Sequence, residues 1–326
     1  MMSRADLPDF QGAAGPSVAR VGNLALLAFD GPDAAAFLHA QLSTDVEGMP
    51  EGFVTWTSYN SPKGRMLASL LLWHRGPGDY LAFVAADLAE ALRKRLSMFV
   101  LRAKVSVTDR TAGSVLFGVA GDGARAAVVA AFGQAPEPGH GRIVEHADVV
   151  ATPDGRYLVR APEASAPAVR AKLKGQDAPP GHWDWLAVRS GVPTITRATQ
   201  DLFVPQTTNF DLVGGIHFRK GCYPGQEIVA RMQYLGRLKE RVFAFHVDAA
   251  PPVPATPIFG EGESAVGTVV NAAPAPEGGS DLLAVVSFAA AESGGLRLGA
   301  RDGPPLAGIE LPYPVPPPTA PNRVKL

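Results

Sequence analysis

The feature that most constrains the fold of this chain is a pattern of strands and helices that occurs twice and then stops. From about residue 23 to 110, and again from about 111 to 174, the sequence alternates strands and helices around a hairpin. Short, mostly apolar runs between turn-forming residues mark the strands, and apolar residues three or four apart mark the helices. Strands joined by short turns pair antiparallel, and amphipathic helices cover one face of the sheet. The pattern therefore predicts an α+β fold with two related modules on antiparallel sheets.

The individual elements follow from the same periodicities. In the first module we expect strands over 23–29, 53–59, 65–73 and 80–84, with helices over 33–42 and 88–99. In the second module we expect strands over 114–120, 142–151 and 156–160, with helices over 123–132 and 164–174. Residues 60–64 and 153–155 are rich in Pro, Gly, Asn and Asp, so they are expected to form the hairpin turns.

After Arg241 the pattern changes to short strands between turns rich in glycine and proline. The expected strands are 241–247, 265–270, 282–288 and 306–311, a spacing typical of a small β-barrel. We therefore predict a flexible leader (1–20), a region of two α+β modules that could be interleaved (21–240, roughly 21–110 and 111–240), a C-terminal β-barrel (241–313) and a proline-rich tail (314–326).

Composition narrows the functional classes. The 326 residues are 46% hydrophobic and 19% charged, which is typical of a folded domain and not of a disordered chain. A net charge of -1 gives no general attraction to nucleic acid or to anionic membranes. A single cysteine forms no internal disulfide, and the start of the chain lacks the apolar core of a secretion signal. These observations predict a soluble, cytoplasmic protein.

The only cysteine, Cys222, lies in the stretch Lys220-Gly221-Cys222-Tyr223-Pro224-Gly225-Gln226-Glu227. The glycines suit a tight loop, and Pro224 suits the start of a helix over 226–231. A helix N-terminus and a nearby lysine favour the thiolate form of a cysteine. An unpaired cysteine is often only a small buried hydrophobe. Here the charged, turn-forming neighbours favour a presented sulfur, which could be a nucleophile, a carrier of a transferred group or one ligand of a transient iron site. A single thiol cannot hold a ferredoxin-type cluster alone, so we predict no stable metal site.

Several motifs together resemble the YgfZ family. The specific part comprises 203–209, Gly214-Gly215-Ile216, the Cys222 motif and Arg231. Two weaker matches are Phe37-Leu38 with 41–46, and 60–65. Members are folate-binding proteins implicated in making or repairing iron–sulfur clusters. The resemblance extends from about residue 20 to Tyr313. It implies the fold of the glycine-cleavage T protein, with a C-terminal β-barrel.

The resemblance also implies a binding site for tetrahydrofolate or a derivative. By family position, the folate contacts would be Asp45, Arg65, Gln206, Asn209 and Arg231. Cys222 and Lys220 would be the functional pair, within a motif completed by Gly221, Tyr223, Gly225, Gln226 and Glu227. Judged without the resemblance, Asp45 and Asn209 would be turn residues and Arg65 a solvated charge. The chain departs from the family at Arg189, where T-protein-like members carry glutamate.

Three functions remain open from the sequence. The first is an accessory protein for iron–sulfur clusters of client enzymes, including enzymes that modify tRNA, with folate and the client or assembly proteins as partners. The second is a folate-dependent one-carbon (aminomethyl) transferase. The cysteine motif favours the first, because methylene transfer to folate does not require a thiol. The third, an RNA-binding or scaffold protein, depends only on small basic clusters such as Arg93-Lys94-Arg95, which lack interleaved aromatic residues for base stacking.

Overall fold

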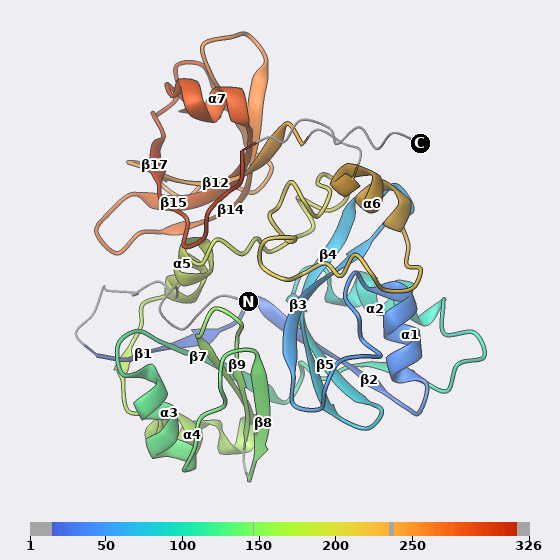
Figure 1. Ribbon diagram of the computed structural model, residues 1–326. Coiled ribbons are helices and arrows are strands. Elements are labelled where there is room, and N and C mark those ends of the chain that lie inside the picture. The colour runs from blue at the N-terminus through green and yellow to red at the C-terminus, as the bar shows by residue number, and fades with distance from the viewer. Residues whose placement is uncertain (1–14, 146, 235–237, 318–326) are drawn as a thin grey trace. The chain divides into compact units, whose positions relative to one another are not determined.

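The computed structural model describes residues 15–145, 147–234 and 238–317 (Figure 1). The chain divides into two compact units, one formed by Met1–Thr57 and Leu70–Trp183 and the other by Ser58–Ser69 and Asp184–Leu326. The second unit therefore includes the hairpin turn around residue 62, although this turn belongs to the N-terminal half of the sequence. The predicted leader up to residue 14 and the predicted tail from residue 318 lie outside the described residues. The expected boundary near residue 240 stays a prediction.

The first unit contains a six-stranded sheet whose strand order is β11-β1-β7-β10-β9-β8. Its strands are β1 (Ser17–Val21), β7 (Ser114–Ala120), β8 (His140–Val144), β9 (Ala147–Ala151), β10 (Tyr157–Pro162) and β11 (Gln176–Asp177). β1 pairs antiparallel with β7 and parallel with β11, and the other pairs of this sheet are antiparallel. β1, the first strand among the described residues, is thus inserted into the sheet of the second predicted module.

Two sequence-based expectations about this sheet were wrong. Residues 17–20 were expected to belong to a flexible leader, yet they form most of β1, which pairs along its length with β7 and buries Val18 and Val21. The single strand expected over 142–151 is instead two strands, β8 and β9, which pair with each other. β8 is largely exposed whereas all of β9 is buried, and the chain turns at Glu145 between them.

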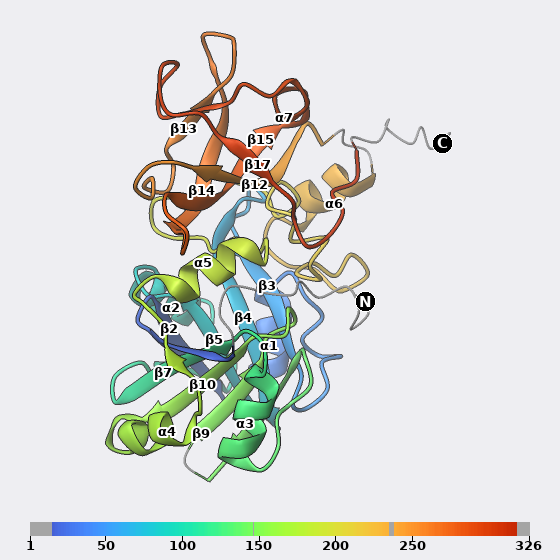
Figure 2. The same ribbon diagram turned by 90° about the vertical axis from the view of Figure 1, so that its left-hand side faces the viewer.

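Two helices cover this sheet. α3 (Ala124–Phe132) packs against β7, and α4 (Ala166–Lys172), which follows the short 3-10 helix η2 (Glu163–Ser165), packs against β10 and α3 (Figure 2). The apolar residues between helices and sheet form one core, centred on fully buried Val119, Val128, Val149 and Val159. The predicted helices at 123–132 and 164–174 are therefore confirmed.

The second sheet has the order β3-β4-β5-β2-β6. Its strands are β2 (Leu24–Asp30), β3 (Val54–Asn60), β4 (Met66–Gly76), β5 (Asp79–Ala85) and β6 (Ser106–Asp109), and its helices are α1 (Ala34–Gln41) and α2 (Ala89–Ser97). α2 packs against β2 and β6. The four strands expected in this module are confirmed, and β6 is an additional one. Residues 58–60 of β3 and 66–69 of β4 belong to the second unit.

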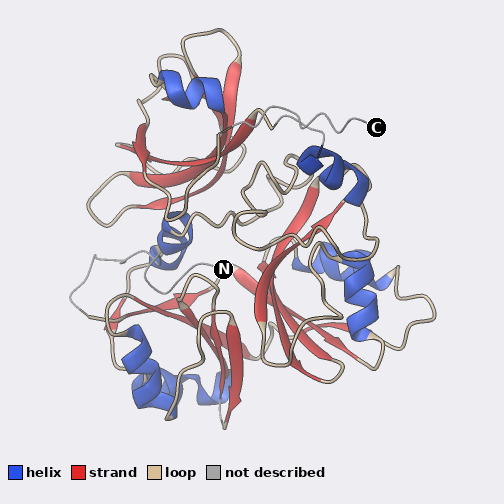
Figure 3. Cartoon of the chain, viewed as in Figure 1, coloured by secondary structure: helices blue, strands red, loops and turns tan. Residues whose placement is uncertain are grey.

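Irregular chain dominates the first part of the second unit. α5 (His182–Arg189) lies at the boundary between the units, and α6 (Gln226–Tyr234) confirms the helix expected after the cysteine motif. Between these helices, residues 190–225 follow a path of turns and extended segments (Figure 3). Such segments are held by side-chain hydrogen bonds and glycine contacts in place of a backbone ladder, and the candidate site is built from them.

The rest of the second unit is a curled six-stranded antiparallel sheet of order β16-β13-β14-β15-β12-β17. Its elements are β12 (Glu240–Val247), β13 (Pro257–Phe259), β14 (Ala265–Pro274), β15 (Ser280–Ser287), α7 (Phe288–Ser293), β16 (Arg297–Leu298) and β17 (Ala307–Ile309). The fully buried residues Ile258, Val269, Leu282 and Val286 centre its core. All four expected strands are present, and the α+β class with a C-terminal barrel-like sheet is confirmed.

Candidate functional site

The candidate site is the loop that carries Cys222. Cys222 is a free, exposed thiol in an extended loop that turns at Pro224 and Gly225 into α6. Its neighbours on either side of the exposed pair 221–222 are buried: Lys220 is 9% exposed and Tyr223 is 7% exposed. The loop is thus anchored at both ends while the sulfur faces solvent. A core cysteine, the alternative reading of this residue, would be buried.

Lys220 and Tyr223 contact each other beneath the loop. The Lys220 ammonium lies 5.0 Å from the centre of the Tyr223 ring, a cation–π contact. Burial raises the pKa of Tyr223 to about 12, so this phenol stays neutral at physiological pH. Gln226 Nε2 also donates a hydrogen bond to the Lys220 carbonyl at 3.5 Å. The predicted partner of the thiol, Lys220, therefore helps to hold the loop.

The second anchor is a close glycine contact between two motifs that are distant in sequence. Gly225 has φ +77° and packs directly on the turn 61–64, so that a Cβ at this position would lie 2.6 Å from the Gly64 Cα. Gly64 has φ +72°, and a Cβ there would lie 2.7 Å from the Ile228 Cβ in α6. Only glycine permits both the positive φ angles and this approach. The turn of the β3–β4 hairpin is therefore the surface on which the Cys222 loop turns into α6.

Hydrogen bonds hold that turn in place within the second unit. The Ser61 hydroxyl donates to Asp201 Oδ1 at 2.8 Å, and the Ser61 N–H donates to the Arg65 carbonyl at 2.8 Å. The Arg65 guanidinium donates to the Leu202 carbonyl. Met66 then exchanges backbone hydrogen bonds with Asp201 and Phe203. The segment 201–203 thus acts as a short additional partner of the hairpin.

The five residues expected to contact folate have different surroundings. Asp45 lies in the first unit, where its carboxylate accepts a hydrogen bond from Gly48 N at 3.1 Å and lies 3.2 Å from His39 Nδ1. Arg65, Gln206, Asn209 and Arg231 all lie in the second unit. Arg65 and Arg231 are exposed, whereas Gln206 and Asn209 are buried.

Gln206 and Asn209 differ in how many of their side-chain amide atoms are hydrogen-bonded to other residues. Gln206 Nε2 donates to the Val229 carbonyl of α6 at 2.7 Å, but its buried Oε1 accepts no hydrogen bond from the described residues. Asn209 Nδ2 donates to the Val242 carbonyl and to the Tyr313 hydroxyl, and its Oδ1 accepts from Arg241 at 3.1 Å. The amide of Gln206 therefore has a free acceptor, while that of Asn209 is engaged on both sides.

A buried ion pair, which the sequence analysis did not predict, lies beside Asn209. Arg241 binds the Asp211 carboxylate through two hydrogen bonds of 2.8 Å, and each side chain is 8% exposed. The Tyr313 hydroxyl donates to the Gly191 carbonyl, and burial raises the Tyr313 pKa. No local sequence signal marks these partners, since residues 191, 211, 241 and 313 come from four separate segments.

Arg189, the departure from the family pattern, has a local partner. Its guanidinium lies 3.8 Å from Asp281, whose carboxylate also accepts a hydrogen bond of 2.8 Å from Trp185 Nε1. His246 Nδ1 lies 2.8 Å from the other Asp281 oxygen, and this contact raises the pKa of His246. The charge of Arg189 thus belongs to a cluster on the barrel sheet.

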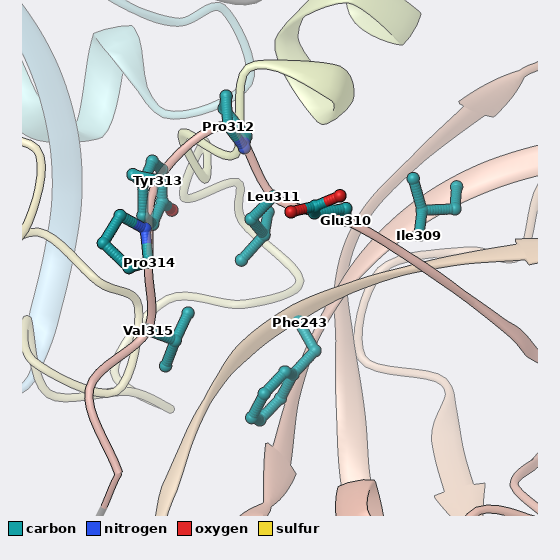
Figure 4. A pocket seen from close by; sticks show the side chains of 8 residues that line it. All are labelled: Phe243, Ile309, Glu310, Leu311, Pro312, Tyr313, Pro314 and Val315. Carbon is teal, nitrogen blue, oxygen red and sulfur yellow. The ribbon is translucent and has the colours of Figure 1, made fainter. Parts of the chain in front are cut away.

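The barrel side of the second unit also carries a groove of about 470 Å³ (Figure 4). Its lining consists of Phe243, Ile309, Glu310, Leu311, Pro312, Tyr313, Pro314 and Val315. Glu310 is the only charged member of this set, and it would repel the glutamate tail of a folate. We assign the groove no role in folate binding.

The described residues contain neither a cluster of metal-ligating side chains nor a membrane-spanning helix. No group of three or more His, Cys, Asp or Glu side chains there has an arrangement that could hold a metal ion. Among the same residues, no helix is both long enough and apolar enough to cross a membrane.

Comparison with solved structures defines the class of protein. The glycine cleavage system aminomethyltransferase T from Bartonella henselae has the same fold, with a TM-score of 0.75 at 17% sequence identity. The match covers 91% of this chain and 86% of that structure. The chain is therefore a protein of the T-protein fold. No family model matches the sequence.

Curated relatives then identify the family. The tRNA-modifying protein YgfZ of Serratia proteamaculans is 30% identical over 264 residues, covering 78% of this chain and 79% of the relative. The protein of that name from Pectobacterium carotovorum is 32% identical over 237 residues, covering 70% and 69%. The one from Sodalis glossinidius is 29% identical over 300 residues, covering 89% and 90%. The chain belongs to the YgfZ family, as the motifs indicated.

Proposed function

We propose that this chain is a folate-dependent accessory protein for the synthesis or repair of iron–sulfur clusters in client enzymes, including enzymes that modify tRNA. One observation carries the proposal: the only thiol of the chain is exposed, while Lys220 and Tyr223 beside it are buried and fix the loop. Membership of a family whose relatives are named tRNA-modifying proteins supports the link to tRNA.

Cys222 is the functional thiol in this proposal. An exposed thiolate can act as a nucleophile, carry a group or ligate iron. As cargo, an iron–sulfur cluster with four thiolate ligands would take one ligand from Cys222 and the others from a client or assembly protein. The lone cysteine also fits a reducing compartment, and we propose a cytoplasmic location.

The second unit offers groups that suit a reduced folate. Gln206 Oε1 is a buried acceptor that no described residue satisfies, and a pterin ring carries N–H donors. Arg65 and Arg231 are exposed cations that would suit the anionic glutamate tail. We keep Asp45 and Asn209 as family-based candidates, although Asn209 already uses its amide on protein partners. When bound, the folate would supply one-carbon chemistry.

Two measurements test this proposal, one of folate binding and one of the role of the Cys222 thiol. Anaerobic titration with tetrahydrofolate, followed by tryptophan fluorescence, should show saturable binding by the wild-type protein. A strain lacking the protein should regain iron–sulfur enzyme activity with the wild-type gene but not with Cys222→Ala or Cys222→Ser. The unfolding temperatures of these variants should match the wild type, because the side chain is exposed.

Gln233→Ala is the matched control, since Gln233 is an exposed residue of the adjacent helix α6. This variant should restore enzyme activity as the wild type does. Restoration of activity by Cys222→Ala would refute the role of the thiol. Absence of binding with any reduced folate would refute folate dependence.

A second candidate is a one-carbon transferase, and the fold shared with an aminomethyltransferase favours it. Turnover of an aminomethyl donor with tetrahydrofolate by both the wild type and Cys222→Ala would favour this activity, because such transfer needs no thiol. We place it second because this activity would make no use of the exposed Cys222 thiol.

A further inference from the structure

The side chain of Asn60 is buried without being satisfied. It is 1% exposed, and neither its Nδ2 nor its Oδ1 has a hydrogen-bond partner among the described residues. Buried side-chain amides in folded proteins almost always bond to protein or to a bound molecule, because desolvation without a partner lowers stability. A free donor and a free acceptor on one buried side chain therefore point to a bound polar ligand.

The position of Asn60 connects it to the Cys222 loop. Asn60 is the last residue of β3, directly before Ser61, whose carbonyl oxygen would lie 2.5 Å from a Cβ on Gly225. Gly225 is followed at once by α6, and Gln206 is bonded to the Val229 carbonyl in that helix. Asn60 therefore precedes a residue whose backbone contacts the start of α6, and Gln206 bonds to that helix directly; both residues belong to the second unit.

The free atoms define the chemistry of the ligand. Asn60 offers N–H donors and a carbonyl acceptor, and Gln206 adds a carbonyl acceptor. The pyrimidine edge of a pterin presents an amino group, a ring N–H and a carbonyl oxygen in a row. Two acceptors and one donor complement that edge. A phosphate or a simple carboxylate has no N–H donor and would leave both protein carbonyls unpaired.

We propose that Asn60 is a binding residue for the pyrimidine edge of the reduced pterin, with Gln206 Oε1 as a second acceptor. This inference rests on the proposed folate dependence and adds a residue that determines its specificity. The amide of Asn60 is kept unpaired in the free protein and gains its partners only when the pterin binds.

The test compares buried Asn60 with Asn271, a half-buried asparagine of the same unit. Asn60→Leu removes the amide at nearly constant volume, and Asn60→Ala removes it without adding bulk. Asn271→Leu is the matched control, because the Asn271 amide exchanges two hydrogen bonds of 2.7 and 2.8 Å with the Thr194 backbone. For each full-length protein, the affinity for tetrahydrofolate is measured by anaerobic calorimetry and the unfolding temperature by calorimetric scanning.

We expect both Asn60 variants to bind tetrahydrofolate about tenfold more weakly, as expected for loss of a hydrogen-bonding group. The unfolding temperature of free Asn60→Leu should equal or exceed that of the wild type, since no hydrogen bond is lost in the free protein. Asn271→Leu should show the opposite result, with a lower unfolding temperature and affinity within about twofold of the wild type.

The outcomes separate this inference from the broader proposal. Equal affinity of the wild type and both Asn60 variants would overturn the role of Asn60 while leaving folate dependence in place. A marked loss of stability in free Asn60→Leu and Asn60→Ala, with unchanged affinity, would show a structural role and overturn it as well. Absence of binding by the wild type would overturn folate dependence and this inference together.

Discussion

Gly225 packs directly on Gly64, and a Cβ at Gly225 would lie 2.6 Å from the Gly64 Cα and 2.5 Å from the Ser61 carbonyl oxygen. This contact joins the loop of the only cysteine to the β3–β4 hairpin. Contacts of this kind cannot relax when a methyl group is added, because the opposing atoms are backbone. The loop position therefore depends on two glycines as much as on the cysteine motif itself.

The first prediction concerns that contact. Gly225→Ala should lower the free energy of unfolding by about 2–4 kcal/mol, from strain at positive φ plus overpacking. Gly214→Ala should cost only about 1 kcal/mol, because Gly214 has a similar φ of +80° but no atom within 4 Å of its Cβ position. Urea unfolding measures both. Equal losses would show that backbone strain alone matters and that the close approach is unimportant.

The second prediction concerns the buried ion pair. Arg241→Leu should lower the free energy of unfolding by about 3–5 kcal/mol, because it leaves the Asp211 carboxylate buried without its partner. The double variant Arg241→Leu/Asp211→Leu should lose clearly less than the sum of the two single variants. A double-mutant cycle by urea unfolding tests this. Additive losses would show that the two side chains do not act as a pair.

The third prediction concerns the Tyr313 hydroxyl. Tyr313→Phe should lower the free energy of unfolding by about 1–3 kcal/mol, since the Gly191 carbonyl and the Asn209 amide both lose a buried partner. Tyr234→Phe is the control. Because Tyr234 is 55% exposed, this change should alter the free energy of unfolding by no more than about 0.5 kcal/mol. Similar unfolding temperatures for the wild type and both variants would contradict the structural role of the hydroxyl.

The fourth prediction is a pH dependence. The hydrogen bond to Asp281, helped by Asp248, raises the pKa of His246 above its ordinary value. Protonated His246 thus stabilises the fold fully below the unfolded pKa of about 6.5, and this contribution is lost as the pH rises through the higher folded pKa. Arg189 is a further charged group near Asp281, at 3.8 Å.

Thermal unfolding between pH 5 and 9 should therefore show that His246→Gln lowers the unfolding temperature at acidic pH and much less at alkaline pH. His217→Gln, a change at an exposed histidine, should reproduce the wild-type profile. A constant difference between the wild type and His246→Gln across this range would show that the histidine acts only by packing.

Much of the fold was predictable because most helices and strands each have a recognisable local pattern of apolar residues. The short apolar runs of β2, β5 and β7 and the 3.6-residue pattern of α2 and α3 each identify an element without knowledge of the rest. β1 was missed because five residues next to a polar, glycine-rich segment carry too little pattern. Only its pairing with β7 and β11 shows that it is a strand.

The candidate site, like the fold, was predictable only in part. The motif around Cys222 was readable, since glycine, proline and charged residues in a short run predict a presented loop before a helix. The contact of Gly225 with Gly64 and the pairing of Arg189 with Asp281 were not readable, because each joins segments that are distant in sequence.

By itself, then, the sequence determined the element types, the α+β class, the cysteine loop and, through its motifs, the family. Only the tertiary structure decided which buried polar groups are satisfied: Asn209 by Val242, Tyr313 and Arg241, and Asn60 by none of the described residues. The physical reason is that backbone periodicity acts over a few residues, whereas the partner of a buried side chain is set by whichever distant segments the packing brings beside it.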